Sequence, residues 1–269
     1  MSNKTCVYTV VIDHYDFTFP AIDPSEASDF FLVTDNPKLN VKGWKTLSID
    51  STLSSLSASM INRYYKFFPH RFFPGYDVSV YVDGNIRIVG SLESLVNEFM
   101  NSQYHIGLLK HPLRSTVLEE VEACIRLEKV KSAAKLHEEY QAYLIAGFSD
   151  TNGLTENNVI LRKHNEPKLI EAMEYWWACI EKSAGRDQIS LSYVREKFQL
   201  NEKIYNFNAR VVNPYFRIYP HRKNKIHLDL GTVLYAKSLT NQFYKPISKI
   251  YSLLLRIVLK ISKIIVRKK

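Results

Sequence analysis

The sequence predicts an α/β fold built on a mixed, mainly parallel β-sheet flanked by helices. Short apolar segments rich in Val, Ile, Tyr and Phe alternate with longer segments of helical periodicity, which is the order expected of βαβ units. The 269 residues are 46% hydrophobic and 23% charged, which excludes wholesale disorder, and only ten Pro and nine Gly exclude collagen-like and low-complexity chains. This length favours one large domain over two small ones.

The individual elements follow from these patterns together with proline and capping residues. Pro69 and Pro74 end the first helix, Pro167 opens a later helix, and Ser91 is expected to cap another. The expected strands are 5–12, 29–34, 44–49, 77–82, 104–110 and 158–162. The expected helices are 53–67, 91–100, two within 115–146, 167–183 and 187–198. After Asn213 the chain is aromatic and basic and gives no clear assignment.

The formal net charge of +9 is concentrated at the C-terminus. Residues 245–269 contain eight basic side chains and no acidic one, whereas the remaining 244 residues hold 28 basic and 27 acidic side chains. The body is therefore nearly neutral, and its charge does not indicate a nucleic-acid-binding protein.

The basic C-terminal segment has the pattern of an amphipathic helix. Its polar positions are spaced three or four residues apart, with apolar runs of at most three residues between them. They are Lys249, Ser252, Arg256, Lys260, Lys263 and Arg267. We expect residues 241–269 to lie on an anionic membrane surface, and residues 1–240 to form the main domain. The alternatives are a last helix packed on the body and, with less support, a nucleic-acid-binding helix.

Cysteine usage and the N-terminal segment indicate the compartment. Cys6, Cys124 and Cys179 are far apart and show no metal-binding spacing, as expected for thiols in a reducing environment. No basic segment followed by an apolar one begins the sequence, and no apolar stretch reaches the roughly 18 residues of a membrane span. We therefore expect a cytoplasmic protein attached peripherally to the inner face of the membrane.

Three of the expected strands end in a carboxylate, namely Asp13, Asp35 and Asp83. In open α/β sheets, ligands bind beyond the carboxyl ends of the strands. Each Asp alone is more simply explained as a turn residue, but the three together favour a crevice for a nucleotide or a metal. The sequence has no GxGxxG, GxxxxGK[ST], HExxH or GxSxG motif, so side chains or a metal would have to neutralise a bound phosphate.

Basic and oxygen-bearing side chains flank the strand that ends at Asp83. Arg63, Lys66 and His70 are spaced to share one helix face. The strand itself is followed by Gly84 and Asn85, and such a D-x-[DN] turn suits Mg²⁺ or Mn²⁺. Taken alone, the tripeptide is more often an ordinary β-turn.

Longer motifs resemble a glycosyltransferase-like family known from plant mucilage-biosynthesis proteins and bacterial polysaccharide clusters. The motifs are YDVSVYVDGNIRI, GLLKHPLRSTVLEEVEA, GFSDTNGLTENNVILRKHN and MEYWWACIEKSAGRDQISLSYV, and the resemblance covers roughly residues 6–193. They are also distantly similar to the family 8 retaining glycosyltransferases. The resemblance implies a GT-A fold of Rossmann type, and transfer of a sugar from a nucleotide donor, UDP-linked by preference, to a lipid-linked or cell-envelope polysaccharide acceptor.

The resemblance also implies roles for individual residues. Asp83 and Asn85 stand where the family has its metal-binding D-x-D, and His221 stands where a late metal-ligating histidine is found; the neutral Asn85 leaves the metal requirement open. Asp187 and Gln188 match the D-Q motif beside the reacting sugar. The implied donor-binding residues are Asp13, Asp35, Arg63, Lys66, Asp83, Asn85, Asn158 and Arg186.

Two further clusters have both a functional and a structural explanation. His111 and Arg114 are expected at the crevice, touching a phosphate or the acceptor, or else Arg114 pairs with Glu119 or Glu120. Trp176 and its neighbour are better explained by core packing than by sugar stacking. Two other functions stay open, a non-catalytic nucleotide- or glycan-binding module of the same shape and a basic membrane-binding adaptor.

Overall fold

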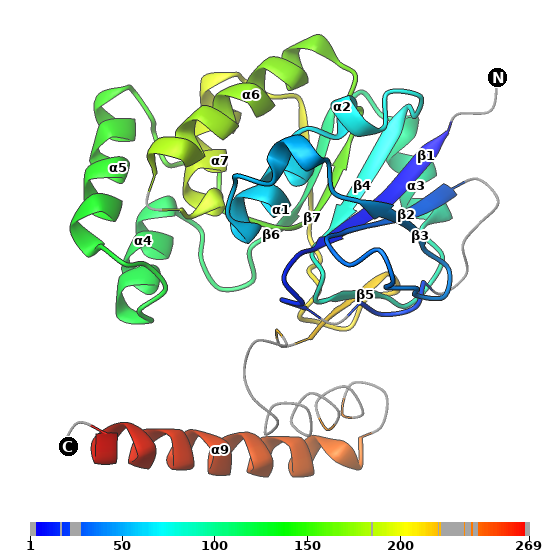
Figure 1. Ribbon diagram of the computed structural model, residues 1–269. Helices are drawn as coiled ribbons and strands as arrows, with labels where there is room; N and C mark the ends of the chain where they lie inside the picture. The colour runs from blue at the N-terminus through cyan, green and yellow to red at the C-terminus, as the bar shows by residue number, and fades with distance from the viewer. Residues whose placement is uncertain are drawn as a thin grey trace.

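The computed structural model describes residues 4–16, 18–21, 28–183, 185–219, 221, 234, 238 and 242–266, with the backbone alone at 255, 256 and 258–266. It confirms the expected mixed α/β fold, a Rossmann-like sheet with helices on its faces (Figure 1). Within this part of the chain the main sheet has seven strands in the order β3-β2-β1-β4-β7-β6-β8, and β7 alone runs antiparallel to its neighbours. The strands are β1 (Thr5–Val11), β2 (Ser28–Thr34), β3 (Lys45–Ser48), β4 (Val78–Val82), β6 (Ile106–Lys110), β7 (Thr155–Arg162) and β8 (Glu202–Tyr205).

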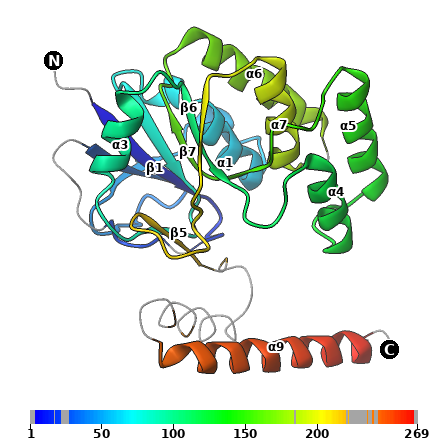
Figure 2. The same ribbon diagram turned by 180° about the vertical axis from the view of Figure 1, so that it is seen from behind.

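Helices cover both faces of this sheet, as the opposite views of Figures 1 and 2 show. Alternate residues of β1 explain the two layers: Tyr8 packs in one apolar cluster with α1 and α6, and Val7 packs in a second with α3. A third cluster joins α4 and α5 to α7. The helices are α1 (Ala58–Phe67), α2 (Pro69–Phe72), α3 (Glu93–Met100), α4 (Val117–Arg126), α5 (Ala133–Ile145), α6 (Pro167–Lys182) and α7 (Asp187–Lys197).

Several local predictions differ from the structure. The helix expected from Leu53 is instead a short 3₁₀ turn, Ser51–Leu53, followed by α1, because Ser57 caps α1 through a hydrogen bond from Met60 N. Leu92, not Ser91, is the N-cap residue of α3. β8 and the short β9 (Phe216–Ile218) were not anticipated, since a three- or four-residue strand has too little periodicity to be recognised.

A two-stranded sheet brings distant parts of the chain together beside β4. β5 (Ile86–Ile88) follows the Asp83–Asn85 turn and pairs antiparallel with β9. Beyond the last pair, Tyr219 N donates to Asn85 O at 2.9 Å and Asn85 Nδ2 donates to Tyr219 O at 2.8 Å. This pairing returns the chain near residue 221 to the turn after β4.

The C-terminal segment forms α9 (Tyr244–Val266), drawn below the sheet in Figures 1 and 2. In the described residues no helix is both long and apolar enough to cross a bilayer. Ile250, Leu253 and Leu254 on this helix are more than half exposed. Lys249 is exposed as well, whereas the side chains of Arg256, Lys260 and Lys263, and the whole of Arg267, lie outside the described residues.

Candidate functional site

A polar cavity of about 850 Å³ lies at the end of the sheet where β4 and β6 terminate. Its wall combines the turn after β4, the start of β7, the first residues of α7, the loop after β6 and the segment after β9. A smaller cavity of about 290 Å³ adjoins it and shares Lys66, Asp83 and Asp187 with it. Residues from widely separated segments therefore face one space large enough for a ligand of drug size or more.

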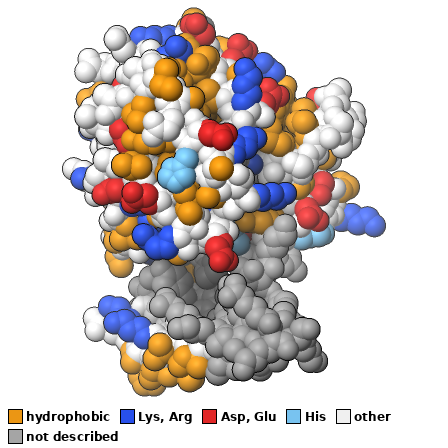
Figure 3. Space-filling view, turned by 90° about the vertical axis from the view of Figure 1, so that its left-hand side faces the viewer, with side chains coloured by type: hydrophobic (Ala, Val, Ile, Leu, Met, Phe, Trp, Pro, Cys, Tyr) orange, Lys and Arg blue, Asp and Glu red, His pale blue; other side chains and the backbone are white. Residues whose placement is uncertain are grey.

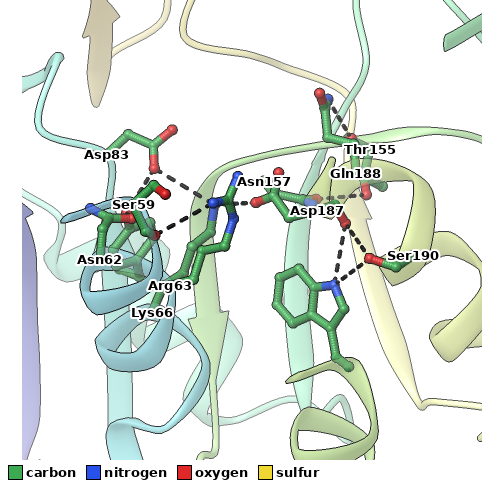
Figure 4. A network of polar contacts seen from close by, with 12 residues as sticks. Ser59, Asn62, Arg63, Lys66, Asp83, Thr155, Asn157, Asp187, Gln188 and Ser190 are labelled. Carbon is green, nitrogen blue, oxygen red and sulfur yellow. Dashed lines mark hydrogen bonds and ion pairs between the residues drawn. The ribbon is translucent and has the colours of Figure 1, made fainter. Parts of the chain in front are cut away.

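Lys66 occupies the centre of this wall (Figure 4). Its Nζ donates to Asp187 Oδ2 at 2.8 Å, lies 3.6 Å from Asp83 Oδ1 and stands 5.1 Å from the centre of the Tyr81 ring. Lys66 lines the cavity, but the residue is only 4% exposed. Tyr81 Oη also donates to Asp83 Oδ1 at 2.8 Å, which fixes that carboxylate. The sequence-predicted residues Lys66, Asp83 and Asp187 thus form one charged cluster.

The charge of Asp187 is maintained by its surroundings. Burial by itself would raise its pKa, but the nearby charges of Lys66 and Arg63 and the Lys66 hydrogen bond hold the pKa well below its usual range. Asp187 is also the first residue of α7, where the helix dipole favours a negative charge. A carboxylate with so low a pKa is ionised at neutral pH and is a weak proton acceptor.

Asp83, Asn85 and His221 lie together at one end of the larger cavity. The Asn85 Oδ1 atom is buried and has no hydrogen-bond partner in the described part of the chain. His221 Nδ1 lies 2.7 Å from Asp16 Oδ1, and this hydrogen bond raises the pKa of His221 despite the opposing effect of burial. A carboxylate, a free amide oxygen and a histidine oriented by a second carboxylate are a set of groups that suits a divalent cation.

Gly84 makes this arrangement possible. A Cβ atom at Gly84 would lie 2.8 Å from Val11 Cγ2 and 2.9 Å from Asp16 Cβ. A larger residue would therefore displace Asp16, the partner of His221.

The start of β7 lines the cavity floor with amides. The register of β7 with β6 is interrupted between the pairs Leu108–Ile160 and Leu109–Glu156, which leaves Asn157 and Asn158 outside the ladder with β6. Both line the cavity, and each has a buried atom, Nδ2 of Asn157 and Oδ1 of Asn158, without a partner in the described residues. Buried polar atoms are rarely left unpaired in proteins, so these amides are available to bind a polar ligand.

Glu120 of α4 organises the opposite wall. It is fully buried, and its carboxylate binds Arg114 Nε at 2.5 Å and Arg186 Nη2 at 3.3 Å. Burial would raise the pKa of Glu120, but a hydrogen bond from Cys124 and the two arginine charges keep it below its usual range. The structural explanation for Arg114 is therefore correct, and the same arginine also lines the cavity.

His111 is held as a neutral group beside these arginines. Its Nδ1 accepts from Arg114 N at 2.9 Å, and burial followed by the charge of Arg114 lowers the pKa of His111 to about 4. It lines the cavity, as do the sequence-predicted residues Asn158, Arg186 and Gln188.

Other sequence-predicted residues lie elsewhere. Arg63 and Asp13 line the smaller cavity, and Arg63 Nη2 donates to Gly185 O at 2.7 Å. Asp35 lines neither of the two cavities and instead accepts a hydrogen bond from Asp13 N at 3.0 Å. His70 does not share the helix face of Lys66, because α1 ends before Pro69 and His70 belongs to α2. Trp176 packs in the core, stacked on Phe67 with ring centres 3.6 Å apart, which confirms the packing explanation.

Sequence reasoning missed several residues of the site. Glu120 could have been found, because it occupies the apolar face of an amphipathic helix with Val117, Val121 and Cys124. Glu156 and Arg210, whose ion pair at 2.7 Å lines the cavity, gave no such signal. Neither did Tyr15, Asp16 and Lys129, which lie near turns.

Comparison with known proteins agrees with the resemblance seen in the motifs. A family model described as TOD1/MUCI70, glycosyltransferase-like domain, matches residues 2–221. The probable hexosyltransferase MUCI70 of Arabidopsis thaliana is 29% identical over 143 residues, covering 49% of this chain and 24% of that protein. The alkaline ceramidase TOD1 of Arabidopsis thaliana is 22% identical over 206 residues, covering 72% of this chain and 44% of that protein. The chain thus spans less than half the length of either relative. Since the family model covers most of the sequence, the chain belongs to the TOD1/MUCI70 glycosyltransferase-like domain family.

Proposed function

We propose that this protein is a glycosyltransferase that moves a sugar from a nucleotide donor to an acceptor bound in the same cavity. The family and the hexosyltransferase relative support glycosyl transfer as the class of reaction. The observation that carries the proposal is the juxtaposition, in one cavity, of Asp83, Asn85 and His221 with the Lys66–Asp187 pair. We further propose that the domain is of GT-A type and that its donor is UDP-linked by preference.

In this proposal the donor diphosphate lies at the Asp83 end of the cavity. Asp83, Asn85 and His221 would hold Mg²⁺ or Mn²⁺, and the bound ion would neutralise charge on the departing nucleotide. The unpaired Asn85 Oδ1 and the Asp16-oriented imidazole are the features that fit such an ion. Lys66 adds a fixed positive charge beside Asp83. Tyr15, whose ring lies 5.0 Å from that of His221, offers a surface on which a base could stack.

Asp187 and Gln188 would act on the sugar. The ionised Asp187 stabilises positive charge that develops at the anomeric carbon. Its low pKa makes it unsuited to removing the acceptor proton, since an effective general base has a pKa near the working pH. This favours a mechanism in which the acceptor hydroxyl attacks on the face from which the nucleotide departs, with retention of configuration: the bond to the nucleotide phosphate breaks, and the departing phosphate oxygen takes the acceptor proton. Gln188, whose Nε2 donates to Thr155 O at 3.2 Å, is held in place to bind a sugar hydroxyl.

The test is nucleotide release from a panel of UDP-, GDP- and CMP-linked sugars, with and without Mn²⁺. We expect the full chain to release nucleotide from at least one donor and Asp83→Asn to release at least about a hundredfold less. Ser149→Ala, at a residue that lines neither of the two cavities, is the control. Ceramide is included because one relative is named a ceramidase. Release of sphingosine from ceramide, with no nucleotide released from any donor, would overturn the proposal.

We also propose that α9 attaches the enzyme to the inner face of a membrane, where a lipid-linked or envelope polysaccharide acceptor would be presented. Exposed Ile250, Leu253 and Leu254 supply an apolar surface, and the basic, acid-free segment 245–269 suits anionic lipids. Replacing these three residues by Ser should weaken sedimentation with vesicles containing phosphatidylglycerol by at least about tenfold, while Ile145→Ser should not. Equal sedimentation of both variants would contradict membrane attachment through α9.

A further inference from the structure

Four of the five most exposed large apolar side chains described within residues 1–240 lie, in the sequence, within two positions of a residue that lines the larger cavity. Ile145 at the far end of α5 is 88% exposed, but the next four are Leu113 at 78%, Val212 at 74%, Leu127 at 54% and Val211 at 51%. Each of these four lies within two positions of a cavity-lining residue: Arg114, Lys129 or Arg210. On α9, Tyr251 and Ser252 also line the cavity, next to exposed Ile250, Leu253 and Leu254. We call Leu113, Leu127, Val211 and Val212 the apolar rim.

Basic groups occupy the same end of the cavity as the apolar rim. Four cations line it, and two carboxylates pair with three of them, which leaves an excess of two positive charges. The cations are Arg114, Lys129, Arg186 and Arg210, and the carboxylates are Glu156, which also lines the cavity, and Glu120, which does not. In the described residues Lys129 has no ion-pair partner and the buried Nε of Arg186 has no hydrogen-bond partner. Figure 3, which faces the side where α4 and α5 lie in Figure 1, shows apolar, basic and acidic side chains interspersed on this side of the molecule.

The Asp83 end of the cavity has no such excess of positive charge. There the carboxylates of Asp83 and Asp187 are matched by two cations, Lys66 and Arg63. The ion pairs with Glu120 hold Arg114 and Arg186 in fixed positions, so the N–H groups that Glu120 does not bind have a defined orientation. A ligand that satisfies the basic end must be anionic at its head, and one that also covers the apolar rim must carry an apolar chain.

We propose that the basic end of the cavity is an acceptor subsite for an amphiphile with a phosphate head. Arg114, Arg186 and Lys129 bind the phosphate, and the apolar rim contacts the first carbons of its chain. This inference rests on the proposed function, because it takes the donor to lie at the Asp83 end. It deepens that function by naming a phosphorylated lipid as the class of acceptor.

The test is calorimetric titration of the full chain with three soluble probes: n-octyl phosphate, inorganic phosphate and n-octyl glucoside. Octyl phosphate should bind at least about tenfold more tightly than either of the others, since it alone has both parts. Lys129→Gln and Arg114→Gln should each remove the preference over octyl glucoside. The double change Leu113→Ser and Val212→Ser should remove the preference over inorganic phosphate. Ile145→Ser, which removes an even more exposed apolar side chain that is not next to a cavity-lining residue, should change neither preference.

Several results would overturn the inference. Inorganic phosphate binding as tightly as octyl phosphate would show that the apolar rim has no part in the site. Loss of vesicle sedimentation by the rim variants with unchanged octyl phosphate affinity would make the rim a membrane-docking surface instead. A parallel loss of UDP affinity in Lys129→Gln, which removes no internal ion pair, would assign the basic end to the donor phosphates.

The outcomes also separate this inference from the proposed function. Nucleotide release without octyl phosphate binding defeats only the acceptor subsite. Octyl phosphate binding with the stated variant pattern, but no release from any nucleotide sugar, defeats the glycosyltransferase proposal and with it the acceptor role, but leaves the binding site for a phosphorylated amphiphile standing.

Discussion

Two buried cations lie one behind the other next to the cavity and are compensated in different ways. Lys66 is paired with two carboxylates, Asp187 and Asp83. Arg162 is completely buried, and its guanidinium donates to Lys66 O at 2.6 Å and to Tyr8 Oη at 2.7 Å, but no described carboxylate lies within ion-pair distance of it. The comparison separates two kinds of buried cation. Lys66 lines the cavity and is balanced by carboxylates, whereas Arg162 lies in the core next to Lys66 and is balanced only by hydrogen bonds to neutral groups.

The largest effect is expected for Lys66→Met. The change leaves two carboxylates without their cation, so the free energy of unfolding should fall by about 3–5 kcal/mol. Nucleotide release should fall about a thousandfold because the charge opposite the departing phosphate is lost. Urea denaturation and the donor assay measure the two effects. Adding Asp187→Asn should restore part of the stability and none of the activity, and a single variant as stable as the wild type would remove the basis of the comparison.

Asp187→Asn alone should affect activity far more than stability. The amide keeps the shape of the side chain but not its charge, so turnover should fall about a hundred- to a thousandfold. Its hydrogen bond with Lys66 becomes weaker, which should cost about 1–2 kcal/mol in urea denaturation. Turnover within about threefold of wild type would show that Asp187 has only a structural role.

His164, close to Arg162 in the core, should make the free energy of unfolding depend on pH. Burial, with a contribution from Arg162, lowers the pKa of His164 to about 4, and its Nε2 lies 2.9 Å from Phe73 O. The unfolded chain binds a proton near pH 6.5 and the native state does not, so this contribution to stability is complete above pH 6.5 and is lost as pH falls toward 4. At pH 5 the loss should be about 2 kcal/mol.

His164→Gln tests this pH dependence by urea denaturation at pH 5 and pH 8. The amide can still donate to Phe73 O but does not titrate, so the difference between the two pH values should shrink by about that amount. His111, whose pKa is also about 4, adds a similar slope that remains in the variant. An unchanged difference would mean that His164 is not kept neutral by its surroundings.

The layered fold was predictable because buried strands and amphipathic helices repeat over many residues. Thr5–Val11 and Pro167–Lys182 were recognised within one residue at each end. The start of β7 was missed because its first four residues, Thr155 to Asn158, are polar, and their burial against the cavity is a tertiary effect. β9 was missed since its three residues are stable only through pairing with β5.

The site was predictable only where its residues follow strand ends or match family motifs. Asp83 and Asp187 belong to such positions. Both contact Lys66, and the bond between Lys66 and Asp187 joins residues 121 positions apart in the sequence, so only the structure reveals it. The bond between Asp16 and His221 crosses 205 residues and depends on the β5–β9 pairing, to which no local pattern points.

The smallest change in stability is expected for Arg162→Met, and it tests the comparison most directly. The variant loses two charge-assisted hydrogen bonds, each worth about 1.5–3 kcal/mol. It also removes a buried charge that no carboxylate compensates, and replacing buried ionic groups by apolar ones of similar size is often neutral or stabilising. We therefore expect the free energy of unfolding to change by no more than about 1 kcal/mol in urea. Arg162→Lys keeps the buried charge but reaches fewer acceptors, so it should be less stable than the Met variant. The opposite order would show that the guanidinium hydrogen bonds outweigh its burial, and that Lys66 and Arg162 do not differ in the way their compensation suggests.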